Sequence, residues 1–169
     1  IKFPVITTVM SNLGLENFLL NNLNIKLKRS SVGDINVINE MQKFGSILGG
    51  EQSGHIILSE FSKTGDGILA ALKVTEIISL IKKPASLVFD LYKNFPQIKI
   101  NIEYKKITEK KIRIIKNLNK QKNIDKDIKI LIRQSGTEPI IRLLVEGRDL
   151  KRVKQNAKIL ETQVRNVLG

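Results

Sequence analysis

The alternation of strand-like and helical patterns constrains the fold of the first half of this chain most strongly. A β-branched apolar run at Pro4–Met10 predicts a buried strand, Leu15–Leu23 has a helical pattern, and a second strand is expected at Ile25–Arg29. A second helix is expected at Ile35–Phe44. Its buried face is predicted to comprise Ile35, Ile38, Met41 and Phe44. This order predicts a parallel or mixed sheet covered by helices.

Two short apolar runs and a longer helix are expected to complete this α/β unit. The runs at 46–48 and 55–58 lie on either side of a glycine-rich turn. The helix is expected at Gly67–Ile81, where Thr64 or Asp66 can accept hydrogen bonds from its free N–H groups. Asn12 or Ser11 is expected to cap the first helix of the chain in the same way.

A domain boundary is expected after Pro84, which follows two lysines and ends the long helix. We predict an α/β domain at 1–84, a linker with a short helical turn at 85–96, and a smaller α+β domain at 97–169. The elements expected in the smaller domain are strands at Ile98–Tyr104, Ile128–Ile132 and Ile140–Val145, helices at Glu109–Lys120 and Leu150–Leu168, and a polar loop at Gln121–Lys126. Apolar residues recur four and three positions apart in the last helix, at Val153, Ala157, Leu160, Val164 and Val167. That stripe predicts packing against a sheet.

The composition excludes several classes of protein. The chain has no cysteine, so it has neither disulfides nor thiolate metal ligands, and a reducing compartment such as the cytoplasm is the expectation. No apolar stretch is long enough to span a bilayer. The first residue is Ile1, close to a strand-like run, and we therefore expect a piece of a longer polypeptide.

The net charge of +13 raises the question of a polyanionic partner. Between Ile98 and Arg133 there are twelve Lys or Arg residues against four Asp or Glu residues. Aromatic residues are few and there is no arginine-rich arm, so we expect no specific nucleic-acid partner and only salt-dependent affinity for polyanions. A non-catalytic basic module that binds polyanions through this segment is the alternative from a different functional class.

A polar cluster between two apolar runs suits a phosphate monoester. It contains the guanidiniums of Arg133 and Arg142, the hydroxyls of Ser135 and Thr137, and Gly136 between those hydroxyls. Guanidinium forks match phosphate oxygens, and glycine lets backbone N–H groups approach a ligand closely. The alternative interpretation is a surface turn with scattered charge.

The glycine-rich loop Gly49–His55 is a second candidate for ligand binding. Its three glycines permit positive φ angles and a tight turn. Glu51, Gln52 and Ser53 offer donors and acceptors suited to neighbouring sugar hydroxyls. His55 is the only histidine, so no two-histidine metal site can form, and a lone histidine here more often completes a loop hydrogen bond. An ordinary glycine-rich hairpin is the alternative.

Taken together, the loops Gly50–His55 and Arg133–Pro139 resemble the sugar-binding and phosphate-binding loops of the α-D-phosphohexomutase superfamily. Other segments that match the family in order and spacing are Thr7–Gly14, Val32–Asp34, Thr64–Gly67 and Val145–Gly147. The resemblance spans essentially all 169 residues and is greatest to the branch that acts on glucosamine phosphates. A sister enzyme acting on glucose or mannose phosphates is the alternative within the family.

The resemblance implies a role for individual residues. The residues implied to bind the sugar are Glu51, Ser53 and His55. Those implied to hold the phosphate that is not reacting are Arg133, Ser135, Gly136, Thr137 and Arg142. Gly33 and Asp34 would lie at a helix start that faces the substrate. Related members follow this pair with Arg-Tyr, whereas this chain has Ile35 and Asn36, so the resemblance implies no role for these two side chains.

The resemblance also implies a reaction and its missing parts. Family members of this branch interconvert glucosamine 6-phosphate and glucosamine 1-phosphate for amino-sugar nucleotide and cell-wall precursor synthesis. They use a phosphoserine in the first of four domains and Mg²⁺ bound by aspartates in the second. This chain has no Ser-His-Asn-Pro-like loop and no Asp-Gly-Asp-x-Asp run, so we expect no catalytic residue and no metal ligand in it. It would correspond to an incomplete third domain and the fourth, and its partners would be a phosphosugar and the N-terminal half of the same enzyme. Alone it is expected to bind phosphosugar weakly and to catalyse nothing.

Overall fold

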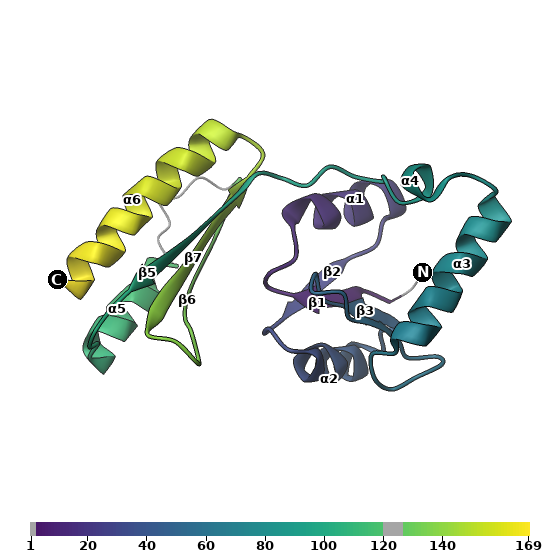
Figure 1. The fold of residues 1–169 in the computed structure, drawn as a ribbon, viewed down its shortest axis with the longest axis horizontal. Coiled ribbons are helices and arrows are strands. Elements are labelled where there is room, and N and C mark those ends of the chain that lie inside the picture. Colours follow the sequence, from purple (N-terminus) through teal and green to yellow (C-terminus); the bar gives the residue numbers. More distant parts are fainter. Residues whose placement is uncertain (1–2, 120–126) are drawn as a thin grey trace. The chain divides into compact units, whose positions relative to one another are not determined.

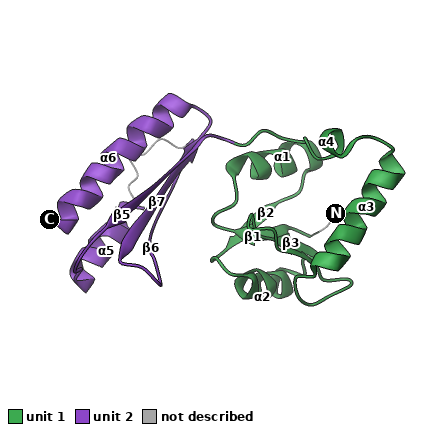
Figure 2. Ribbon diagram, in the orientation of Figure 1, with its two compact units in different colours: residues 1–94 green, residues 95–169 purple. Residues whose placement is uncertain are grey.

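The structure is a computed structural model that describes residues 3–119 and 127–169. It divides into two compact units, unit 1 at Ile1–Asn94 and unit 2 at Phe95–Gly169 (Figure 2). The segment predicted as a linker, 85–96, spans this division, and its residues up to Asn94 belong to unit 1. The predicted polar loop at 121–126 and the predicted end of the preceding helix at Lys120 lie outside the described residues.

Unit 1 is built on a four-stranded mixed sheet, which confirms the predicted architecture (Figure 1). Its strands are β1 (Val5–Thr8), β2 (Leu27–Ser30), β3 (Leu48–Gly50) and β4 (Ile56–Leu58), in the order β2-β1-β3-β4. The strands β2, β1 and β3 are parallel, as expected for strands joined through helices, and β4 returns antiparallel to β3.

Four helices accompany this sheet: α1 (Leu13–Leu23), α2 (Asp34–Phe44), α3 (Gly67–Ile81) and α4 (Ala85–Val88). Figure 1 shows α1 and α2 on opposite sides of the sheet. Helix α1 is capped by Asn12, the residue before its first turn. The side chain of Asn12 accepts a hydrogen bond from Gly14 N at 2.7 Å. The segment after α4 returns to α1, where the rings of Tyr92 and Phe18 stack at 5.9 Å between centroids.

The core of unit 1 lies between α2 and the strands. The buried residues that form it are Ile6, Val37, Met41 and Ile57. The predicted buried face of α2 was wrong at Ile35, which is 59% exposed, while Val37 is fully buried. Val37 and Met41 lie directly over Gly49 in β3, where an added Cβ would be 2.3 Å from Met41 Sδ and 2.9 Å from Val37 Cγ1. The absence of a side chain at position 49 therefore decides which face of α2 packs on the sheet.

Unit 2 is an antiparallel sheet covered on one face by two helices. Its strands are β5 (Gln97–Glu103), β6 (Ile128–Gln134) and β7 (Ile140–Gly147), in the order β5-β7-β6. Its helices are α5 (Glu109–Leu118) and α6 (Leu150–Leu168). This is the α+β arrangement that the sequence predicts.

The core of unit 2 confirms the predicted stripe of α6. Its buried members are Ile102, Ile115, Leu118, Ile132, Ile141, Leu143, Val145, Val153, Ala157, Leu160 and Val164, and Val167 packs against them partly buried. Alternate strand residues point to opposite faces, so the residues between these core positions lie on the face that α5 and α6 do not cover. None of the described helices combines the length and apolar character that crossing a membrane requires.

Candidate functional site

The predicted sugar-binding loop is the connection from β3 to β4. Glu51 N donates to His55 O at 2.9 Å and Gly54 N donates to Glu51 O at 3.1 Å, which closes a tight turn. Of the three glycines expected to take positive φ, only Gly54 does so, at 105°. Gly49 and Gly50 are strand residues that are needed for close packing instead, and a Cβ at position 50 would lie 2.5 Å from His55 O.

The carboxylate of Glu51 is oriented by two partners. Its Oε1 accepts a hydrogen bond from Gly33 N at 3.0 Å, and its Oε2 lies 3.5 Å from His55 Nδ1. The side chain is only 9% exposed. Gly33 is the residue at which α2 begins and has a φ of 117°, so the carboxylate sits against the positive end of that helix.

Ser53 and His55 complete this cluster. Ser53 Oγ lies 3.3 Å from His55 Nδ1, and both residues are exposed. The structure therefore brings Glu51, Ser53 and His55 together within one loop, with a carboxylate, a hydroxyl and an imidazole side by side. The carboxylate of Glu51 can accept hydrogen bonds from hydroxyl groups, and Ser53 or His55 can donate one to a hydroxyl oxygen. This combination suits a pair of sugar hydroxyls.

The contact between Gly33 and Glu51 was not predicted from the sequence, although the helix start at Gly33–Asp34 was. Beside it, Asp34 Oδ1 accepts from Ile35 N at 2.8 Å, and Asn36 Nδ2 donates to Val32 O at 2.8 Å. These two polar side chains stabilise the first turn of α2.

The predicted phosphate-binding residues lie where β6 passes into β7. Strand β6 runs two residues further than predicted, to Gln134, and this places Arg133 directly opposite Arg142 of β7. Residues that face each other across an antiparallel pair point to the same side of the sheet, here the side without helices. Asn101 of β5 is the other neighbour of Arg142 in the same row.

Two guanidiniums facing each other are unfavourable unless negative charge lies between or beside them. Arg142 Nη2 donates to Glu138 Oε2 at 2.6 Å, which neutralises part of this charge. Arg142 Nε is buried and has no hydrogen-bond partner among the described residues. The pair therefore retains unused donors and net positive charge, which are the properties of an anion-binding site.

The turn between β6 and β7 comprises residues 135–139 and is closed by a backbone hydrogen bond. Ser135 N donates to Ile140 O at 2.9 Å, and Ser135 is buried, whereas Gly136 and Thr137 are exposed. An added Cβ at Gly136 would meet nothing within 4 Å, and its φ is not positive. Neither the packing of the described part of unit 2 nor its backbone geometry requires glycine at this position.

The described cations of the 98–133 segment are divided between the two sides of the sheet in unit 2, and Lys129, opposite Glu146, lies on the side of Arg142. Lys99 is opposite Leu144, so it lies on the same side of the sheet as Arg142, two positions away. Lys110 and Arg113 belong to α5, which packs on the other side. This distribution gives little support to a single polyanion-binding face.

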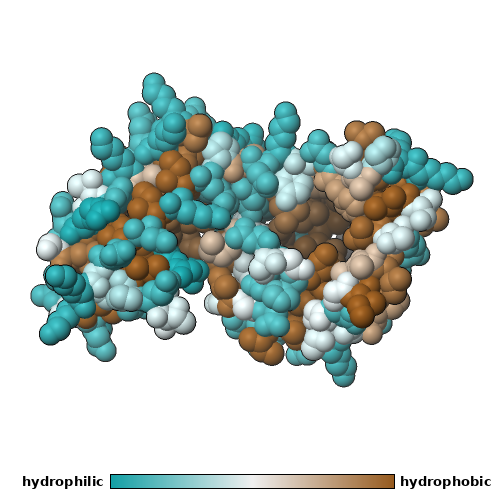
Figure 3. Space-filling model, in the orientation of Figure 1, coloured by the Kyte–Doolittle hydropathy of each residue, from teal (hydrophilic) through white to brown (hydrophobic). Residues whose placement is uncertain are grey.

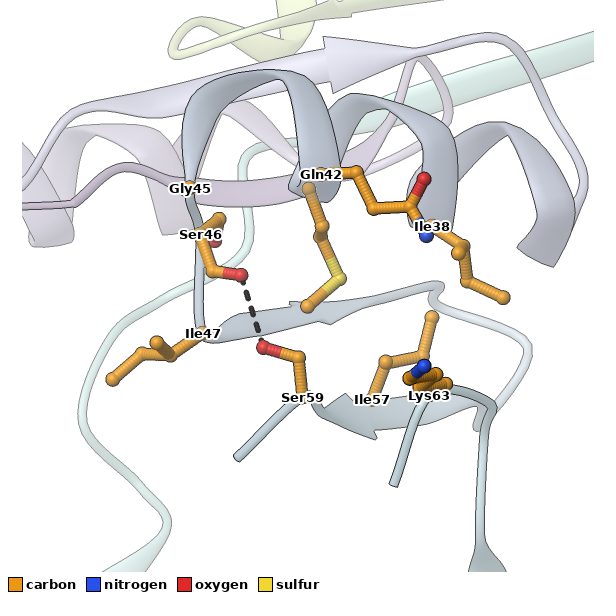
Figure 4. Close-up of a pocket in the computed structure, with 9 residues that line it drawn as sticks. Ile38, Gln42, Gly45, Ser46, Ile47, Ile57, Ser59 and Lys63 are labelled. Carbon is orange, nitrogen blue, oxygen red and sulfur yellow. Dashed lines mark hydrogen bonds between the residues drawn. The ribbon is translucent and has the colours of Figure 1, made fainter. Parts of the chain in front are cut away.

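A pocket of about 320 Å³ lies in unit 1 between α2, β4 and the loop that follows β4 (Figure 4). Its walls include Met41 and Ile57, and Ser59 Oγ donates to Ser46 O across it at 3.1 Å. None of the predicted site residues lines it. We therefore do not assign the phosphosugar to this pocket.

The described residues do not fit a magnesium site. They contain no group of three or more His, Cys, Asp or Glu side chains that could hold a metal ion. The carboxylates near the candidate loop have other partners, since Glu51 binds Gly33 N and Asp66 accepts from Ile68 N and Leu69 N at the start of α3. Of the two residues predicted to cap this helix, Thr64 and Asp66, the structure shows that Asp66 does so.

Comparison with known proteins assigns both units to one family. Residues 2–95 match the family model of phosphoglucomutase/phosphomannomutase α/β/α domain III, and residues 81–162 match the model of its C-terminal domain. A phosphoglucosamine mutase of Campylobacter jejuni (strain RM1221) is 43% identical over 99% of this chain. The chain spans about a third of the length of the curated relatives it matches, 36% in this case.

Solved structures show the same fold. Aspergillus fumigatus N-acetylphosphoglucosamine mutase superposes with a TM-score of 0.76 at 17% identity, over 99% of this chain and 39% of the fungal chain. The fungal enzyme in complex with GlcNAc-6P and magnesium gives a TM-score of 0.69 at 17% identity, over 98% of this chain and 41% of the other. With two family models covering most of its length, this chain belongs to the phosphoglucomutase/phosphomannomutase family, in which it matches domain III and the C-terminal domain.

Proposed function

We propose that this chain is the sugar- and phosphate-binding part of a phosphoglucosamine mutase, an isomerase that acts in the cytoplasm. The support is the identity of 43% with the Campylobacter jejuni phosphoglucosamine mutase, together with the two loops described above. The whole enzyme would interconvert glucosamine 6-phosphate and glucosamine 1-phosphate by transferring an enzyme-bound phosphoryl group to the free O1 or O6 and taking back the phosphoryl group of the other oxygen. The donor of that group and the Mg²⁺ ligands would belong to other domains.

The observation that carries the proposal is the opposition of Arg133 and Arg142 on the helix-free side of unit 2. We assign these arginines to the phosphate that does not react. The hydroxyls of Ser135 and Thr137, and the backbone at Gly136, would supply further donors. A phosphate held at this end orients the sugar, so that binding energy is used to position the reacting oxygen.

The loop of unit 1 is assigned to the sugar. Glu51 would accept hydrogen bonds from ring hydroxyls, with its carboxylate held by Gly33 N, and Ser53 and His55 would contact neighbouring hydroxyls. Neighbouring hydroxyls of a hexose present similar donors when the ring is turned over. This property suits an enzyme that must bind its substrate in two orientations, one for each phosphate position.

The test is isothermal titration calorimetry of this chain with glucosamine 6-phosphate. Each charge-assisted hydrogen bond contributes about 1.5–3 kcal/mol, so Arg133→Ala with Arg142→Ala is expected to weaken binding by at least about tenfold. The matched control is Lys110→Ala with Arg113→Ala, which removes the same charge from α5 on the other side of the sheet. This control is expected to retain the affinity of the unsubstituted chain.

An equal loss of affinity for glucosamine 6-phosphate in both double variants would show that binding depends only on the net charge of the chain. The assignment of the phosphate to Arg133 and Arg142 would then be wrong. Titration with glucose 6-phosphate separates the branches of the family. Tighter binding of glucose 6-phosphate than of glucosamine 6-phosphate would favour a sister mutase over the proposed one.

A further inference from the structure

Helix α3 is apolar around most of its circumference and yet is only partly covered: Leu69, Ala70, Val74 and Ile78 are half-buried and its other apolar side chains are exposed. The structure describes all of its residues and buries none of them. Its exposed large apolar side chains are Ile68 (78%), Leu72 (64%), Ile77 (40%), Leu80 (75%) and Ile81 (48%). A helix that is apolar all round is normally buried in a core, because its exposure forfeits the free energy of removing that surface from water. These five residues are called the α3 surface below.

The α3 surface is part of a wider asymmetry between the units. Among the described residues, unit 1 has seven buried apolar residues and unit 2 has thirteen, although unit 1 is the longer. Other apolar side chains of unit 1 are also exposed, among them Leu20 and Leu23 of α1, and Leu87 and Phe89 after α3. Figure 3 shows apolar residues over α3 and around a hollow between α3 and the region of α1 and α4. Unit 1 therefore has the surface of a domain whose core is only partly closed.

We propose that the α3 surface binds the N-terminal region of the same enzyme, and that this contact completes the core of unit 1. This inference rests on the proposed function, which assigns the chain to a longer mutase. The Campylobacter jejuni relative is nearly three times as long as its matched part, and this chain already contains the match to the C-terminal domain. Most of the remainder of such an enzyme, including any missing part of domain III, therefore precedes the matched part.

The structure also indicates where that region would join. Ser46 Oγ donates to Pro4 O at 2.6 Å, which fixes Pro4 beside the end of α2 within unit 1. A polypeptide that continues from there is tethered to the unit that carries the α3 surface. Tethering gives an effective concentration of about millimolar for a short connection, so a covalently joined segment is favoured over a second copy of the chain.

The experiment compares this chain alone with a chimera, in which it replaces the matching part of the Campylobacter jejuni phosphoglucosamine mutase. Hydrogen exchange of the α3 amides is expected to slow by at least about tenfold in the chimera. The double variant Leu72→Glu with Leu80→Glu is expected to lower the thermal midpoint of the chimera by about 5 °C or more, because it buries two charges. The same variant is expected to leave the midpoint of the isolated chain unchanged.

The matched control is Ile159→Glu on α6, at a residue 56% exposed in unit 2. It is expected to leave the thermal midpoints of both the chimera and the isolated chain unchanged. Equal exchange of α3 in both proteins, or a Leu72→Glu, Leu80→Glu chimera as stable as the parent, would overturn the proposal. So would a chimera that does not fold, since complementary surfaces are required. A dimer of the isolated chain with slowly exchanging α3 amides would assign the surface to a second copy instead.

Mutase activity separates this inference from the proposed function. A chimera that is inactive but protects α3 would contradict the proposed function and support the docking surface. A chimera that is active but has freely exchanging α3 amides would support the proposed function and contradict the docking surface.

Discussion

At the scale of single residues, Glu51 has two tasks that can be separated. Its carboxylate accepts the hydrogen bond of Gly33 N, which stabilises the start of α2, and we assign the same carboxylate to the sugar. Gly136 is the opposite case, because nothing in the described structure requires glycine at that position. These two residues therefore allow fold and binding to be tested independently.

Replacement of Glu51 by alanine is expected to lower the free energy of unfolding of unit 1 by about 1–2 kcal/mol, because Gly33 N loses its acceptor at the positive end of α2. Glu51→Gln keeps an acceptor oxygen and is expected to lose less than half as much. Urea denaturation followed by circular dichroism measures both. Gln52→Ala, at an exposed position in the same loop, serves as the control, and a cost equal to that of Glu51→Ala would refute the role of the carboxylate.

Replacement of Gly136 by alanine is expected to change the stability of unit 2 by less than about 0.5 kcal/mol, because the added Cβ meets nothing within 4 Å. Its affinity for glucosamine 6-phosphate is nevertheless expected to fall severalfold, since the Cβ would occupy space assigned to the ligand. Thermal melting and calorimetric titration of the same sample give the two quantities. Unchanged affinity would place the phosphate elsewhere.

At the scale of elements, the helices differ in how strongly they are tied to a core. Both α3 and α6 begin at an aspartate whose side chain accepts backbone hydrogen bonds, Asp66 and Asp149 respectively. Helix α6 buries four residues in the core of unit 2, whereas α3 buries none among the described residues. The cap of α6 is therefore expected to contribute to the cooperative stability of unit 2, whereas the cap of α3 is expected to stabilise that helix only locally.

This difference predicts opposite results for two matched substitutions. Asp149→Ala is expected to lower the global free energy of unfolding of unit 2 by about 1 kcal/mol, the usual cost of losing a helix cap. Asp66→Ala is expected to leave the global transition of unit 1 unchanged and to accelerate amide exchange in α3 about fivefold. Denaturant unfolding and hydrogen exchange measure the two effects. A global loss of similar size for Asp66→Ala would show that α3 is part of the cooperative core.

At the scale of the whole molecule, the chain has two cores of unequal size. Among the described residues, unit 1 has seven buried apolar residues, of which four form its largest cluster, and unit 2 has thirteen, of which eleven form one cluster. Because apolar burial supplies most of the free energy that opposes chain entropy, unit 1 is expected to be the less stable.

We expect calorimetry of this chain to show two transitions, of which the lower belongs to unit 1. Ile57→Ala is expected to lower the first transition and Leu160→Ala the second, each by a cavity cost of about 2–5 kcal/mol. One sharp transition that shifts equally in both variants would show that the chain unfolds as a single cooperative unit.

The sequence alone predicted the local features well, and particular residues explain why. The helices at Gly67–Ile81 and Leu150–Leu168 have the predicted bounds, because a capping aspartate and an apolar period both lie within the segment itself. The candidate loops were identified for the same reason, since their donors and acceptors are adjacent in the chain. The buried face of α2 was wrong at Ile35, because that face depends on the missing side chain of Gly49 in another element.

The amino-acid sequence by itself thus determined the order of the elements, the bounds of α3 and α6 and the chemistry of the two loops, which depend on neighbouring residues. Only the tertiary structure decided that Glu51 is held by Gly33, that Arg133 faces Arg142, and that α3 is only partly covered. Each of these depends on strand register or on packing between residues far apart in the chain. Such contacts form only when the whole unit folds, and local preferences do not specify them.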